Sequence, residues 1–174
     1  ILIERMVETP ALVRTVREKV WTGGKLASEL VKGKEAEGAK FSDYFEFDEP
    51  ISNMPSHRAL ALLRGEKEGV LKINLDLPHE SDKRHPVVTT IMSEFGIADR
   101  GRAADAWLAE TARQAWKTRL SPTSFTDLVS RLKERSDNEA IRVFSRNMKD
   151  LLLAAPAGPK VVMGVDPGIR TGCK

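Results

Sequence analysis

The residue whose type and position could most directly do chemistry is Asp166, which follows the hydrophobic run at residues 161–165 and precedes Pro167 and Gly168. The run predicts a buried strand, and metal-dependent nucleases place carboxylate ligands at strand ends. Such carboxylates hold divalent ions that stabilise the attacking and leaving oxygens of a phosphodiester. A magnesium site of this kind draws acids from several strands, and we expect the others to lie beyond this chain. Asp166 is therefore either one ligand of a larger metal site or a structural acid.

A second group of candidate residues is basic and lies on or just after a helix predicted over residues 55–64. Its members are His57, Arg58, Arg64 and Lys67. Arginine and lysine neutralise phosphates, and His57 can donate a hydrogen bond, so this group is a candidate nucleic-acid-binding site. Alternatively, Arg58 and Arg64 form ion pairs that fix the preceding segment in place. The acids available for those pairs are Asp43, Glu46, Asp48 and Glu49.

The histidines and the cysteine predict neither a metal site nor a cofactor. His79 and His85 lie in a polar loop at residues 78–86, but their spacing of six fits no common ligand pattern and no cysteine stands nearby. We interpret this segment as a solvated loop. The single cysteine, Cys173, excludes an internal disulfide and suits a reducing cytoplasm.

The composition is ordinary for a soluble protein. Of 174 residues, 30% are charged and 41% are hydrophobic, and the formal net charge is +3. No apolar run approaches the roughly 20 residues of a membrane helix, and nothing resembles a signal peptide, so we expect a cytoplasmic protein without a membrane partner. The weak positive charge does not by itself indicate nucleic acid. Because Ile1 stands where an initiator methionine would, we expect a piece of a longer protein.

The N-terminal elements that must position these residues are predicted to be helices. Residues 1–8 are read as the tail of one helix. A second helix begins after Thr9 and Pro10 and ends at the glycine pair 23–24, since its apolar residues recur at helical spacing. A third short helix is predicted over residues 25–32. Helices joined by a glycine turn form either a DNA-binding helix-turn-helix or a hairpin packed in a core.

The middle of the chain predicts an aromatic loop, a helix and a strand. After a polar connector at residues 33–40 come the aromatic residues Phe41, Tyr44, Phe45 and Phe47. They carry more hydrophobic surface than an exposed linker normally does, so we expect the loop to pack. Gly65 is expected to end the helix at residues 55–64, and the alternation at residues 70–75 predicts a short strand.

Residues 86–152 show helical periodicity. Trp107 is expected to face inward, Ser121 and Pro122 to interrupt the helix, and Ser136 with Glu139 to form the capping box of a last helix. The predicted buried face of that last helix consists of Ile141, Phe144, Met148, Leu151 and Leu152. The predicted outer faces of the last two helices are basic, and we interpret them either as a solvated surface or as a binding surface. The basic residues are Arg131, Lys133, Arg135, Arg142, Arg146 and Lys149.

These elements predict a mainly α fold. We expect a multi-helical block with helix-turn-helix-like hairpins and one short β element over residues 1–155, with polar loops at residues 33–40 and 78–86. A linker follows at residues 156–160. Residues 161–174 are then expected to begin an α/β domain of the RNase H-like class, because they place an acid after a hydrophobic strand.

Three runs in the middle of the chain resemble the central part of the Tex family of bacterial transcription accessory proteins. They are the aromatic run ending in Glu-Pro at residues 41–50, Pro-Ser-His-Arg-Ala-Leu at residues 55–60 and Arg-Gly-Glu-Lys-Glu-Gly-Val-Leu at residues 64–71. A second resemblance lies at residues 161–174, where Gly-Val-Asp-Pro-Gly is similar to the first strand of the YqgF domain of Tex proteins. That domain is itself similar to RuvC-type resolvases.

The resemblance implies a fragment of a Tex-like transcription accessory protein, acting as a non-enzymatic scaffold associated with RNA or DNA. It implies that most nucleic acid is bound by helix-hairpin-helix and OB-fold domains absent here. It also matches Asp166 to the first catalytic position of the resolvase-like fold and implies that this acid is vestigial, because Tex proteins lack a complete nuclease set.

Two alternatives remain open from the sequence. One is a metal-dependent, RuvC-like nuclease built on Asp166 with acids beyond this chain. The other is a protein-interaction scaffold for the transcription machinery, anchored by the aromatic loop. Exposure of Phe41, Tyr44 and Phe45 would favour the interaction scaffold, and their burial would count against it.

Overall fold

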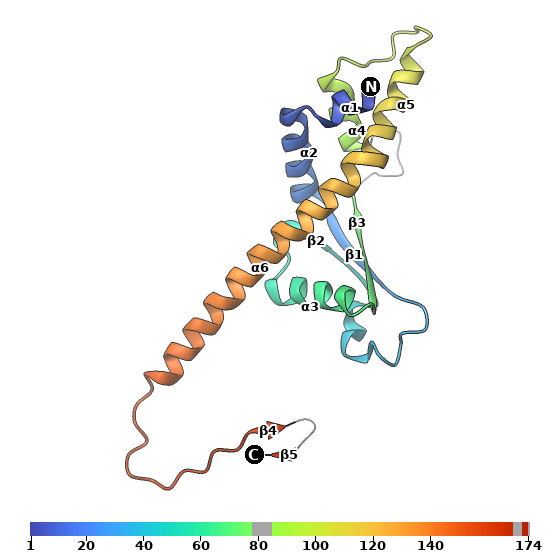
Figure 1. The fold of residues 1–174 in the computed structure, drawn as a ribbon. Helices are drawn as coiled ribbons and strands as arrows, with labels where there is room; N and C mark the ends of the chain where they lie inside the picture. Colours follow the sequence, from blue (N-terminus) through green and yellow to red (C-terminus); the bar gives the residue numbers. More distant parts are fainter. Residues whose placement is uncertain (78–84, 169–171, 174) are drawn as a thin grey trace. The chain divides into compact units, whose positions relative to one another are not determined.

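The computed structural model describes residues 1–77, 85–168 and 172–173, which form two compact units, Ile1–Ile141 and Arg142–Lys174 (Figure 1). The helices are α1 (Leu2–Val7), α2 (Pro10–Gly23), α3 (Ser56–Lys67), α4 (Pro86–Glu94), α5 (Asp105–Ala115) and α6 (Ser121–Leu152). The strands are β1 (Lys25–Leu30), β2 (Glu46–Pro50), β3 (Leu71–Asp76), β4 (Pro167–Gly168) and β5 (Gly172–Cys173). The mainly α prediction is confirmed. Among the described residues, no helix is long and apolar enough to cross a membrane.

The first unit contains a three-stranded antiparallel sheet, in the order β2, β1, β3, in place of the single short β element expected. Ser28 of β1 stands opposite Phe47 of β2 and Ile73 of β3, so the central strand has a partner on each side. The predicted third helix at residues 25–32 is therefore wrong, and so is the helix-turn-helix that it would have formed with α2. Partners distant in sequence override the helical propensity of Lys25–Leu30.

The aromatic loop packs against the core, as predicted. Its first half is a 3-10 turn, Ala39–Tyr44, and its second half runs into β2. Phe41 is only 4% exposed, and Tyr44 meets Phe47 edge to face with ring centroids 5.3 Å apart. Tyr44 and Phe45 are partly buried against the same core. This burial counts against the loop as an exposed anchor for a protein partner.

Helix α3 and strand β3 confirm the predicted helix and strand, but Gly65 does not end the helix. The helix continues to Lys67, and its N-cap, Pro55, provides no capping side chain. Gly65 is needed for packing instead, since a Cβ at this position would lie 2.5 Å from Cδ1 of Leu71. The close approach of α3 and β3 therefore depends on the missing side chain.

One polar side chain caps α4, and another, at the start of α5, fixes the segment that precedes that helix. Nδ1 of His85 accepts hydrogen bonds from the backbone N–H groups of Val87 and Val88 at the start of α4. Asp105, only 3% exposed, accepts from the side chain of Arg102 and from the backbone N–H groups of Arg100 and Arg102. The Arg102 hydrogen bond, followed by those backbone bonds, lowers the pKa of the Asp105 carboxyl to about 2.

Helices α5 and α6 are joined by a π-helical turn, Trp116–Leu120, rather than separated by a break. The interruption expected at Ser121 and Pro122 is wrong, because the wider turn accommodates a proline that cannot donate to the helix. The predicted capping box is also wrong: Ser136 is buried inside α6, and Glu139 accepts a hydrogen bond from Ser56 of α3. Trp107, expected inside, is 61% exposed.

The C-terminal half of α6 departs from the prediction in its burial. The buried residues of α6 are Ser124, Leu128, Leu132 and Ser136. The predicted buried face further along, Ile141, Phe144, Met148, Leu151 and Leu152, is exposed. The helical periodicity of these residues was predicted correctly, but no described residue packs against them.

Residues 161–166 form no regular strand, because among the described residues no neighbouring strand supplies hydrogen-bonding partners. The assignment of this segment to an RNase H-like domain stays a prediction.

The contact between Gly65 and Leu71 generates a stability prediction. We expect Gly65→Ala to lower the free energy of unfolding by about 1–3 kcal/mol, because the added methyl group must displace a buried leucine. Gly23→Ala is the matched control, since a Cβ there meets nothing within 4 Å. Urea unfolding of both variants measures the difference, and equal stability of the two would contradict the packing argument.

The low pKa of Asp105 generates a pH prediction. The folded-state pKa of about 2 lies below the ordinary 3.8, so the carboxylate stabilises the fold above about pH 4 and loses that contribution as the pH falls toward 2. We expect Asp105→Asn to melt at a lower temperature than the wild type at neutral pH, with a gap that narrows between about pH 4 and 2. A gap independent of pH would show that the charge of Asp105 is not the stabilising feature.

Candidate nucleic-acid interface

The predicted basic residues all lie on α3 and are exposed, but they do not share one face. At about 100° per residue, His57 and Arg64 lie within roughly 20° of each other around the helix axis, and Lys67 within roughly 80° of His57. Arg58 lies roughly 120° from Arg64. The structure therefore places His57, Arg64 and Lys67 along one side of α3, with His57 about two turns before Arg64, and places Arg58 on a different side.

Arg58 has a structural partner. Its guanidinium lies 3.0 Å from the Glu49 carboxylate at the end of β2, and the Glu49 side chain is only 20% exposed. This pair confirms, for Arg58, the alternative that a basic residue of α3 fixes the preceding segment. Arg58 is then the least available of the four for phosphate.

Arg64 forms a different ion pair from the one predicted. It contacts Glu68 at 2.8 Å, one helical turn further along, and Lys40 contacts the other oxygen of the same carboxylate at 2.6 Å. The hydrogen bond from Lys40, and then that from Arg64, lowers the pKa of the Glu68 carboxyl. Two cations thus share one anion, which leaves this end of α3 with a net positive charge.

Lys67 and His57 complete the candidate face. In the described parts of the chain, neither side chain has an ion-pair partner. Lys67, Arg64 and Lys40 can supply charge to a phosphate, and His57 can supply a donor. The arrangement suits backbone contact with a nucleic acid rather than base recognition, since Phe41, whose ring lies 5.0 Å from Nζ of Lys40, is only 4% exposed and so is not available for base stacking.

The other chemical candidates are not assembled into a site. Asp166 is exposed in a segment without regular structure. Within the described residues, no group of three or more His, Cys, Asp and Glu side chains could hold a metal ion. His79 lies outside the described residues. His85 is buried, with its ring 5.2 Å from that of Trp116.

Two of the six basic residues that the sequence analysis assigned to an outer helix face, Arg131 and Arg135, lie instead at the contact between α2 and α6. The guanidinium carbons of Arg131 and Arg135 lie 4.0 and 5.2 Å from the ring centroid of Trp21. Arg131 also forms an ion pair with Glu18 at 2.9 Å. Arg135 instead donates to backbone carbonyls at 2.8–3.3 Å, those of Ile51, Ser52 and Met54. In the sequence, only the four-residue spacing of Arg131 and Arg135 indicates that both could contact the same residue, which the structure shows to be Trp21.

The comparisons with known proteins agree on one family. The Tex central region-like family model matches residues 1–144. The chain is 48% identical over 181 residues to "Protein tex" of Bordetella pertussis and 46% identical over 176 residues to "Transcriptional accessory protein Tex" of Neisseria gonorrhoeae. Both matches cover 100% of this chain and 23% of the relative, so the chain spans about a quarter of their length. It is also 29% identical, over 86% of its length and 15% of the relative, to human "S1 RNA-binding domain-containing protein 1".

The ion pairs of α3 generate a prediction about stability. We expect Arg58→Ala and Arg64→Ala each to change the free energy of unfolding by less than about 1 kcal/mol, because the arginine side chains are 45% and 68% exposed. Arg58→Ala should have the larger effect, since Glu49 is the less exposed partner. Chemical denaturation tests this, and a loss well above that bound at Arg64 would assign it a structural role.

Proposed function

This chain belongs to the Tex family, and we propose that it is a non-enzymatic scaffold that contacts RNA or DNA during transcription. Most of the nucleic acid would be bound by domains outside this chain, and the transcription machinery is the proposed protein partner. The name of the Neisseria gonorrhoeae relative supports a role in transcription, and that of the human relative supports RNA as the ligand.

The observation that carries this proposal is the exposed basic face of α3. His57, Arg64 and Lys67 lie along one side of α3, and Lys40 reaches the same carboxylate as Arg64. Arg64 and Lys40 can leave their surface ion pairs with Glu68 for a phosphate, since such pairs contribute at most about 1 kcal/mol. Arg58 is assigned to structure rather than to binding, because it pairs with the less exposed Glu49.

The scaffold part of the proposal is supported by how α6 joins distant parts of the first unit. Arg135 of α6 donates hydrogen bonds to the backbone carbonyls of Ile51, Ser52 and Met54, which precede α3. Ser56, at the start of α3, donates to Glu139 of α6. Arg131 meanwhile reaches Glu18 and Trp21 of α2. These contacts hold the basic helix in a fixed place relative to α2 and α6, as a surface for a long polyanion requires.

Fluorescence anisotropy with labelled single-stranded RNA and duplex DNA, over a range of salt concentrations, tests the proposed contact. We expect saturable binding that weakens as salt rises, and a log-log salt slope that falls by about 1 for each phosphate-binding side chain removed. Arg64→Ala and Lys67→Ala, tested singly and together, should show that loss, and Arg58→Ala is the matched control for each single variant. Failure of the wild-type chain to bind either ligand at low salt would overturn the proposal for this part of the protein.

A further inference from the structure

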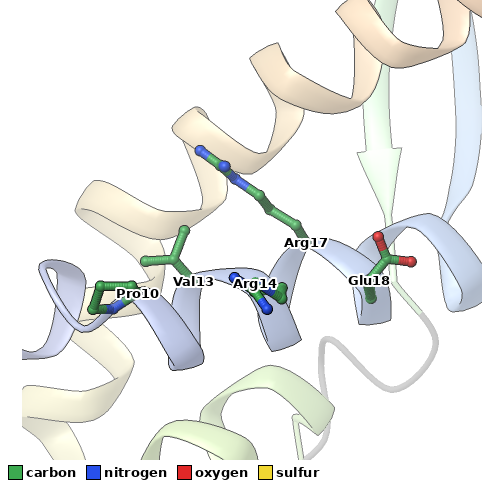
Figure 2. A pocket seen from close by; sticks show the side chains of 5 residues that line it. All are labelled: Pro10, Val13, Arg14, Arg17 and Glu18. Atoms are coloured by element: carbon green, nitrogen blue, oxygen red, sulfur yellow. The ribbon is translucent and has the colours of Figure 1, made fainter.

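Two adjoining grooves run along α2, separate from the basic face of α3. One, of about 480 Å³, is lined by Pro10, Val13, Arg14, Arg17 and Glu18 (Figure 2). The other, of about 240 Å³, is lined by Arg17, Glu18, Trp21, Ser124, Asp127, Leu128 and Arg131. Because Arg17 and Glu18 line both, the two grooves are continuous along α2, and the second is bounded on its other side by α6; we call the two together the α2–α6 trough.

The trough follows one stripe of α2. Positions 10, 13, 14, 17, 18 and 21 recur at intervals of three and four residues, so they lie on one side of the helix. Figure 2 shows Arg17 extending from α2 toward the neighbouring helix, and its guanidinium lies 2.5 Å from the Asp127 carboxylate of α6. Arg14, one turn earlier, is exposed and forms no ion pair within the described part of the chain.

The charges of the trough favour a phosphate ligand. All of its basic side chains are arginines, Arg14, Arg17 and Arg131, and the planar guanidinium binds phosphate oxygens in pairs. Its two carboxylates, Glu18 and Asp127, are partnered by Arg131 and Arg17 in ion pairs whose side chains are all 45–57% exposed. Pairs so exposed contribute little, so a phosphate can replace a carboxylate at small cost.

The aromatic ring beneath Arg131 adds preorganisation. The guanidinium carbon lies 4.0 Å from the centroid of Trp21, within the range of a cation–π contact. A guanidinium held in this way loses less conformational entropy when it binds an anion. Arg131 therefore presents a fixed donor at one end of the trough, and Arg14 presents an exposed donor at the other, without an ion pair among the described residues.

We propose that the α2–α6 trough binds the phosphodiester backbone of a single-stranded nucleic acid, with Arg14, Arg17 and Arg131 contacting successive phosphates. This inference rests on the proposed function and assigns to it a second contact surface. A concave, arginine-lined groove suits a flexible strand that can follow it, as in other single-strand binders. A rigid duplex presents its phosphates on a convex surface and reaches fewer of these arginines at once.

The test compares two double variants that change net charge equally, Arg14→Glu/Arg17→Glu in the trough and Arg58→Glu/Arg64→Glu on α3. With labelled single-stranded RNA and the full chain, the trough variant is expected to lower affinity roughly tenfold or more at low salt and to flatten the salt dependence. Thermal melting of each variant confirms that it remains folded. Wild-type binding to single-stranded RNA should exceed binding to a duplex of the same sequence.

A gain of affinity separates binding from damage to the fold. Glu18→Gln/Asp127→Asn removes both carboxylates that compete with phosphate, so this variant is expected to bind single-stranded RNA several-fold more tightly. Wild-type binding that survives in the trough variant but is lost in the Arg58/Arg64 variant would overturn the inference and leave the proposed function standing. Binding of a labelled poly-glutamate peptide that is lost in the trough variant, while RNA binding by that variant is unchanged, would also overturn it and would identify an acidic protein segment as the ligand. Absence of any wild-type RNA or DNA binding would instead overturn the proposed function itself.

Discussion

The contact on which the first unit most depends is made by Arg135 of α6. Its guanidinium lies 5.2 Å from the centroid of Trp21 and donates to the carbonyls of Ile51, Ser52 and Met54. Those carbonyls belong to the 3-10 turn between β2 and α3, where few backbone partners are available. Hydrogen bonds from a charged donor typically contribute about 1.5–3 kcal/mol each. One side chain thus joins the long helix, α2 and the entrance to α3, and so fixes where the basic face of α3 lies.

The parts of the fold that could be predicted are those determined by local chemistry. Thr9 and Pro10 begin α2 and the glycine pair at 23–24 ends it, because capping and φ preferences act over a few residues. The alternation at residues 70–75 likewise identified β3, whose burial pattern alternates at its start. The aromatic loop was predicted to pack because its hydrophobic surface needed cover, wherever that cover came from.

The parts that could not be predicted depend on partners distant in sequence. Lys25–Leu30 forms a strand because it pairs with β2 and β3, and the sequence of the segment itself does not identify these partners. Pro122 reads as a helix break unless the π-helical turn before it is known. For the candidate site, the sequence placed His57 and Arg64 correctly on a helix but placed Lys67 just beyond it, and only the fold shows that the helix includes Lys67 and that Arg58 pairs with Glu49.

Arg131 and Arg135 lie on the same helix, but Arg135 has a structural role whereas Arg131 is available to bind a ligand. They lie one turn apart and both approach Trp21, but the donors of Arg135 are used on backbone carbonyls, whereas Arg131 holds a single exposed ion pair with Glu18. A ligand cannot displace Arg135 without removing the donor to the part-buried carbonyls of Ser52 and Met54, and an unsatisfied buried acceptor costs about 1–3 kcal/mol. It can displace Glu18 from Arg131 at little cost. The same aromatic ring therefore anchors a structural arginine and orients a ligand-binding one, so the α2–α6 trough can exchange partners while the scaffold beneath it stays fixed.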